Sequence, residues 1–139
     1  MAANISPIFG LTGNFPSATI AAANTARDGS GSLVTLLTVG ANGSRIDRVT
    51  FISAQATAAA NSAMVARLFI TDTAGANPRL YREIAISAIT ASNTVIGSTQ
   101  TMTFLGGLIL QSGQILKVTQ SIYAGVQDQF HVFAEGMDF

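Results

Sequence analysis

Apolar and polar residues alternate along two stretches in the middle of the chain, on either side of a segment rich in turn-forming residues. In residues 64–71 one face collects Met64 and Leu68, and residues 80–86 repeat the two-residue period. The segment between them, residues 72–78, contains Asp, Gly, Asn and Pro. Period-two alternation on both sides of such a segment predicts a β-hairpin with a long loop.

Comparable runs predict further strands along the rest of the chain. They lie at residues 17–23, 33–39, 44–55, 99–105, 114–123 and 129–135. In the run at 44–55, Ile46 and Val49 are three residues apart and cannot share a face of a regular strand, so a bulge is predicted near Asp47 and Arg48. The Asn-Gly pair at 42–43 is a strong signal for a tight hairpin turn.

Three connecting segments have less regular patterns. Residues 54–63 are rich in alanine and predict either a short helix or a turn. Residues 87–98 predict a polar connection, and residues 106–113 and 125–127 predict turns. About eight strands without a long helical pattern predict an all-β fold, a two-sheet antiparallel β-sandwich, with the jelly roll as one arrangement that fits.

The first 16 residues differ from the rest of the chain. They carry no charge and no clean period, yet they hold several large apolar residues, and their glycines and prolines disfavour a helix. We therefore predict an extended N-terminal arm at residues 1–16, followed by a single β-sandwich domain at residues 17–139. The apolar side chains of the arm are expected to pack either on their own sandwich or on a neighbouring subunit.

Composition narrows the functional classes. Only 10% of the 139 residues are charged, against about 25% in an ordinary soluble domain, and seven Lys and Arg balance seven Asp and Glu. Either the surface is covered with uncharged polar residues, or much of it is covered by other subunits, because charge is depleted in interface cores. A chain with no net charge and no basic run is not expected to bind nucleic acid. No stretch predicts a secretory signal or a membrane span.

Residues with catalytic or metal-binding chemistry are sparse. The chain has no cysteine, and its one histidine, His131, is expected to pair locally on a strand face. No nucleophile, zinc or phosphate-binding motif is present, so we predict neither an enzyme nor a cofactor. Charged residues near Arg45 and near Arg82 are expected to form ion pairs at sheet edges. Alternatively, Arg67, Arg79 and Arg82 present hydrogen-bond donors to the carboxylates of a partner.

Five short motifs carry a resemblance to a known group of proteins. They are an Asp-Gly-Ser-Gly turn at 28–31, a hairpin at 40–48, Arg-Leu-Phe-Ile at 67–70, Arg-Leu-Tyr-Arg-Glu at 79–83, and Ala-Glu-Gly-Met-Asp-Phe at 134–139. With these motifs the chain resembles small structural proteins of tailed bacteriophages and prophages from about residue 22 onward. The resemblance implies a virion structural protein and supplies no enzymatic residues.

Within that class, the expected function is that of a capsid decoration or cement protein, which stabilises the phage head by binding across capsid subunits. Its expected partners are the major capsid protein and further copies of itself, as a homotrimer or other homo-oligomer. It would be made in the host cytoplasm and located on the head surface, with no membrane or nucleic-acid partner. The alternatives are a head-fibre-base or tail protein and, from another class, a carbohydrate-binding module, although the chain has no Trp.

The candidate interface residues are apolar residues of the arm, three arginines and the aromatic residue at position 139. They are Ile5, Ile8, Phe9, Leu11, Phe15, Arg67, Arg79, Arg82 and Phe139. The arm is the expected clamp, and Phe139 and the loop Asp72–Pro78 are expected to make secondary contacts.

Overall fold

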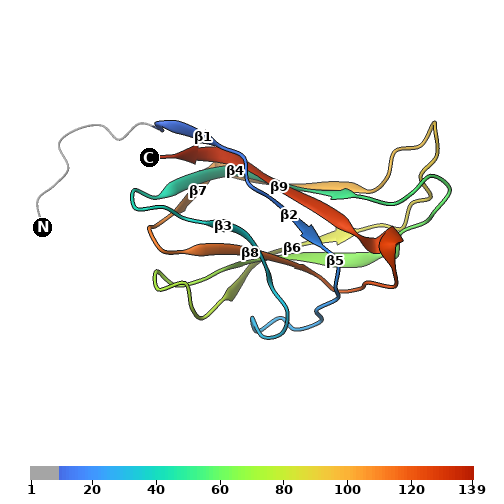
Figure 1. The fold of residues 1–139 in the computed structure, drawn as a ribbon, viewed down its shortest axis with the longest axis horizontal. Helices are drawn as coiled ribbons and strands as arrows, with labels where there is room; N and C mark the ends of the chain where they lie inside the picture. The colour runs from blue at the N-terminus through green and yellow to red at the C-terminus, as the bar shows by residue number, and fades with distance from the viewer. Residues whose placement is uncertain (1–9) are drawn as a thin grey trace, which may run out of the picture.

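The chain forms an antiparallel β-sandwich in a computed structural model that describes residues 10–139 (Figure 1). This range contains nine strands and one short 3-10 helix. The elements are β1 (Thr12–Asn14), β2 (Ser17–Ile20), β3 (Val34–Thr38), β4 (Ser44–Ser53), β5 (Met64–Ile70), β6 (Arg79–Ile86), β7 (Thr99–Leu110), β8 (Ile115–Gln120), η1 (Val126–Asp128) and β9 (Phe130–Asp138). The predicted all-β sandwich is confirmed.

The two sheets have the strand order of a jelly roll. The five-stranded sheet runs β1-β9-β4-β7, and β2 pairs with β9 beyond the end of β1. The four-stranded sheet runs β3-β8-β5-β6. From β2 onward the chain therefore builds the sheets β2-β9-β4-β7 and β3-β8-β5-β6, which is the double Greek-key arrangement of the jelly roll. Figure 1 shows the two sheets as separate layers.

Every second side chain along the strands points inward, and these side chains fill the space between the sheets. Phe130, Val132 and Ala134 of β9 point inward and are completely buried, as the pattern at residues 129–135 predicts. They meet apolar residues of the four-stranded sheet, among them Leu68 and Val118. Removal of this apolar surface from water is the main force that holds the layers together.

The predicted bulge in β4 is confirmed, and it is accompanied by a larger one in β7. In the pairing with β9, Asp47 is an extra residue of β4 between Ile46 and Arg48, and the pairing of β4 with β7 shifts at the same place. Ile46 pairs with Leu108 and Arg48 pairs with Thr103, so residues 104–107 of β7 are extra residues that loop out of the ladder. The predicted turn at 106–113 is therefore wrong at its start. Gly106 and Gly107, with φ of 78° and 82°, form a bulge, and the strand continues to Leu110.

A second bulge changes which residues of β6 share a face. Leu68 pairs with Arg82 and Phe69 pairs with Leu80, which leaves Tyr81 as the extra residue. The two-residue period predicted for residues 80–86 would place Leu80 on the same face as Arg82 if the strand were regular. The bulge moves Leu80 to the other face and brings Arg79, which pairs with Ile70, onto the face of Arg82.

The long connections around residues 54–63 and 121–129 are held by polar side chains that are buried or half-buried. Residues 54–63 form a turn rather than a helix, because the amide of Gln55 donates to the carbonyls of Ala59 and Ile89 and a bridge joins Ala60 to Thr90. Buried Asp128 in η1, where a turn was predicted, accepts hydrogen bonds from the Ser62 amide and hydroxyl and from the Ala124 amide.

The described part of the predicted arm packs on its own sandwich. β1 pairs with β9, and the Leu11 amide donates to the Asp138 carbonyl over 2.8 Å. The ring of Phe15 stacks on Phe133 of β9 with 5.5 Å between centroids. The candidate contacts Ile5, Ile8 and Phe9 lie outside the described residues.

Candidate interaction surfaces

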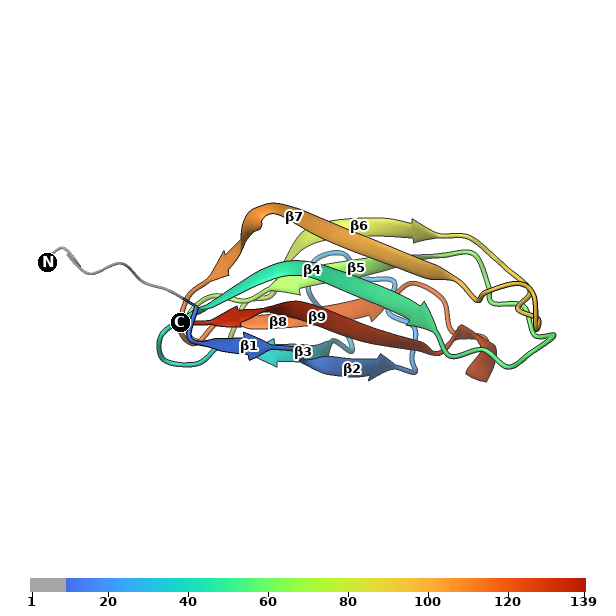
Figure 2. The ribbon, with the colours of Figure 1, turned by 90° about the horizontal axis from the view of Figure 1, so that it is seen from above.

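The outer face of the five-stranded sheet is the first candidate surface. Cross-strand neighbours on this face include Thr50, which pairs with Phe133 on one side and Thr101 on the other. Phe15 is 63% exposed although it stacks on Phe133, and Ile52 is also exposed. These residues border a shallow hollow of about 370 Å³. Among the described residues no loop crosses this face (Figure 2).

Charge on this face is neutralised within the chain. Arg48 forms an ion pair with Glu135, its register partner on β9, and this hydrogen bond raises the pKa of Arg48. His131 shares a 3.0 Å hydrogen bond with the Thr19 hydroxyl, which confirms the predicted local pairing. What remains accessible is a mixture of threonine hydroxyl groups and apolar side chains.

The outer face of the four-stranded sheet is covered by the connection between β2 and β3, residues 21–33. The Arg67 guanidinium points to this side, where it donates to the Asn24 carbonyl over 3.0 Å and to Glu83 over 2.8 Å. Glu83 also pairs with Arg27 of the connection. Arg67 is buried, so the prediction that it faces a partner is wrong. Its guanidinium instead ties the covering loop to β6.

The loop Asp72–Pro78 is closed upon itself. The Asp72 carboxylate accepts hydrogen bonds from the amides of Ala74 and Ala76 and from the Asn77 side chain, at 2.7–3.1 Å. These bonds, led by that of Ala76, lower the pKa of Asp72. Its oxygens therefore serve mainly to shape the loop.

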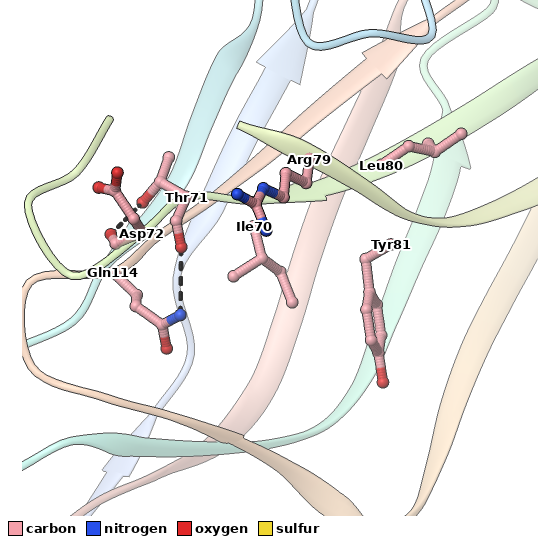
Figure 3. Close-up of a pocket in the computed structure, with 7 residues that line it drawn as sticks. All are labelled: Ile70, Thr71, Asp72, Arg79, Leu80, Tyr81 and Gln114. Atoms are coloured by element: carbon pink, nitrogen blue, oxygen red, sulfur yellow. Dashed lines mark hydrogen bonds between the residues drawn. The ribbon is translucent and has the colours of Figure 1, made fainter. Parts of the chain in front are cut away.

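The open side of the sandwich between β6 and β7 is the second candidate surface. Both strands are end strands of their sheets, so no further strand of the described chain closes this side. Two hollows of about 300 and 330 Å³ lie along β6, and Tyr81 borders both of them. The second is lined by β6 and β7, whereas the first is lined by β6, the end of β5 and Gln114. Figure 3 shows Arg79 in the first hollow beside Ile70, its register partner, with Tyr81 further along the strand.

In the second hollow, Arg82 connects the two sheets. Its Nη1 donates to the Thr103 carbonyl over 2.8 Å, and its guanidinium lies 5.0 Å from the centre of the Phe104 ring. Next to Phe104 the β7 bulge carries Leu105, whose exposed fraction of 99% makes it the most exposed large apolar residue of the described chain.

The last predicted contact, Phe139, is half-buried at the end where the chain enters β4. Its amide donates to the Gly43 carbonyl over 3.2 Å, and its ring borders a hollow of about 430 Å³ together with Ile109 and Leu110. Leu11 of the arm is exposed. It lies at the same end of β9, where its amide donates to the Asp138 carbonyl.

Two kinds of site are not found within residues 10–139. No three His, Asp or Glu side chains in this range gather closely enough to hold a metal ion. None of the helices described there is long and apolar enough to cross a membrane.

Sequence reasoning missed several exposed residues of these surfaces. The exposed residues Tyr81, Leu105 and Ile52 were not among the candidates. Half-buried Phe133 was not among them either, although alternation placed it opposite the buried residues of its strand. The consecutive glycines at 106–107 were the available signal for a bulge, but a bulge and a turn use the same residue types.

Comparison with protein-family models and with curated protein sequences finds no match. Two solved structures are similar to the chain, both of infectious bursal disease virus. The Gx strain structure has 14% identity and a TM-score of 0.29, and the chain covers 34% of it. The Gt strain structure has 16% identity and a TM-score of 0.30, and the chain covers 36% of it. In each case 98% of this chain is covered, so it spans about a third of the viral chains.

Proposed function

We propose that the protein is a structural component of a tailed-phage virion, in the role of a capsid decoration protein. It binds the outer surface of the head across neighbouring capsid subunits and adds buried area that opposes their separation. The partners are the major capsid protein and further copies of this chain. The role is one of binding rather than catalysis. The same chemistry would suit a head-fibre base or a tail component, which the localisation experiment below separates from the head surface.

The observation that carries the proposal is the open outer face of the five-stranded sheet. It presents Phe15, Ile52 and Phe133 as an apolar strip, and its Arg48–Glu135 ion pair is satisfied within the chain. Contiguous exposed apolar surface on a small protein marks an interaction site. The motif resemblance and the low charge content are consistent with a protein that is used within an assembly.

Each copy needs only a modest contact to have an effect. A decoration protein occupies many equivalent positions on a shell, so its contribution to head stability is the sum of many contacts of moderate area. When several copies are linked as an oligomer, binding of one copy to the shell raises the effective concentration of the others at the neighbouring positions. Light scattering coupled to size-exclusion chromatography of the purified protein should therefore report a trimer or another small oligomer.

The decisive experiment adds purified protein to phage particles that lack it. We expect saturable binding, heads that release DNA at a higher temperature, and electron-microscopic density on the head surface. Density confined to the tail would contradict the decoration role, and failure to bind any part of the particle would contradict a virion role.

Two variants locate the contact. Removing residues 1–9 leaves β1 and its pairing with β9 intact, so it tests this part of the arm separately from β1. Ile52→Thr reduces the apolar strip while keeping a β-branched residue in β4. Both should reduce particle binding, whereas Ile96→Ala, at an 80% exposed residue on the connection between β6 and β7, should not.

A further inference from the structure

We propose that the open side of the sandwich between β6 and β7 binds an extended segment of a partner protein in which two acidic residues are separated by one other residue. The inference rests on the proposed function, because the partner would be another protein of the same particle. It adds a second contact, distinct from the outer face of the five-stranded sheet, and states the chemistry that this contact recognises.

The first step is a charge census. Arg27, Arg45, Arg48 and Arg67 each form an ion pair with a carboxylate of the chain. Arg79 and Arg82 form none with any described residue, and both are exposed on β6. Asp72 borders the same hollow as Arg79, and the charge of Arg79 helps to lower its pKa, but its carboxylate forms no ion pair with Arg79 and already accepts three hydrogen bonds within its own loop. The two described arginines without a carboxylate partner are therefore close together on one edge of the molecule.

The second step is geometry. Because Tyr81 is a bulge residue, Arg79 and Arg82 lie on the same face of β6, opposite Ile70 and Leu68 of β5. Ile70 and Leu68 are two residues apart on a regular strand, so the two arginine positions are about 7 Å apart along it. An extended peptide places residues i and i+2 on one face at the same spacing of about 7 Å. Each arginine can then meet one carboxylate with a two-pronged hydrogen bond.

The third step concerns rigidity and the apolar surroundings. Arg82 is held in place by the Thr103 carbonyl and the Phe104 ring, which leaves its other donors for a ligand without a large entropic cost. Tyr81 lies between the two arginines in the sequence, and its ring centre is 6.0 Å from that of Phe104. Leu105 and Ile109 on β7 are exposed on the opposite rim. Apolar residues beside the acidic ones in the partner would cover these side chains.

The test uses short synthetic peptides and the whole chain, with nuclear magnetic resonance at low salt as the readout. The probe is the peptide acetyl-Thr-Glu-Val-Glu-Thr-amide. Its matched control, acetyl-Thr-Glu-Glu-Val-Thr-amide, has the same composition and charge but adjacent acids. We expect the probe to shift the amide signals of residues 79–82 and 103–109, and to bind about tenfold more tightly than the control because only the probe engages both arginines.

Variants assign the binding to the named side chains. Arg79→Gln should weaken binding of the probe about tenfold, and Arg27→Gln, which removes the same charge from an arginine already paired with Glu83, should leave it unchanged. Arg79→Glu should no longer bind the probe. It should instead bind a variant of the probe peptide in which lysine replaces the first glutamate. Arg79 makes no hydrogen bond to the described chain that these changes would break, so folding should not confuse the result.

Equal binding of the two peptides, or signal shifts confined to other surfaces, would overturn the inference. So would an effect of Arg79→Gln on self-association alone, which would assign this edge to a second copy. The proposed function fails separately. If the probe binds as described but the protein does not bind particles, the site stands and the virion role falls. If Arg79→Glu binds particles normally and no peptide binds, the virion role stands and the proposed peptide site falls.

Discussion

The outer faces of the two sheets differ in that a segment of the chain covers one of them and no described segment covers the other. Behind the four-stranded sheet, residues 21–33 cross the strands and are tied down by Arg67, which joins Asn24 to Glu83. Phe69 is completely buried there although it lies outside the central core cluster. Behind the five-stranded sheet no described segment crosses, and Phe15 is left exposed on top of Phe133.

The difference separates residues that hold the fold from residues that are available to a partner. An arginine that is buried with its carboxylate and carbonyl partners costs stability when it is removed. An exposed aromatic pair contributes little to folding, but it can be covered by another protein. Substitutions behind the four-stranded sheet should therefore reduce stability, and those behind the five-stranded sheet should mainly reduce binding.

The largest expected effect comes from Gly136, where β9 is paired on both sides. A side-chain carbon at this position would lie 1.9 Å from the Arg45 carbonyl oxygen of β4. Because the obstacle is backbone, Gly136→Ala should lower the free energy of unfolding by about 3 kcal/mol or more. Gly13→Ala is the control, since no atom beyond the adjoining residues lies within 4 Å of the added carbon. Urea denaturation of both variants checks this, and similar stabilities would contradict it.

The next effect tests the covered face. Arg67→Ala removes the hydrogen bonds to Glu83 and to the Asn24 carbonyl. Breaking a buried pair typically costs about 3–5 kcal/mol, but Glu83 keeps Arg27 as a partner, so we expect a loss of about 2 kcal/mol. Faster hydrogen exchange in residues 21–33 should accompany the loss. Unchanged exchange in that loop would show that Arg67 does not hold the cover in place.

A smaller effect tests the open face. Phe15→Ala removes the stacking on Phe133, and since Phe15 is mostly exposed we expect a loss of only about 1 kcal/mol in unfolding free energy. The same variant should bind particles less well. A stability loss as large as that of Arg67→Ala would mean that the open face is part of the core rather than a surface for partners.

The smallest effect concerns acid and the covering loop. Hydrogen bonds from the Ser30 hydroxyl and amide lower the pKa of Asp28 below its ordinary value of 3.8. A lowered pKa stabilises the folded state above pH 3.8, and this contribution is lost as the pH falls through the folded-state pKa. Asp28→Ala should therefore be slightly less stable than the parent at neutral pH, and the difference should shrink in strong acid. Denaturation curves at both pH values test the sign.

Local patterns were sufficient for the class of fold and for part of the register. Period-two alternation identified the strands and the inward residues of β9, because each side chain on a strand alternates by geometry alone. The three-residue spacing between Ile46 and Val49 was sufficient for the bulge in β4, since both side chains had to reach one core. The low charge content and the apolar arm likewise came directly from the residue types.

Which residues form the candidate interaction surfaces could be decided only from the tertiary structure. Whether an arginine is buried or exposed depends on which distant segment passes over it, and only the path of residues 21–33 buried Arg67 while Arg79 stayed exposed. The bulge at Tyr81 depends on how β6 is paired with β5, so a pattern read along β6 alone placed Leu80 on the wrong face. Alternation is a property of one strand, whereas exposure and bulges depend on pairing and covering between segments far apart in the chain.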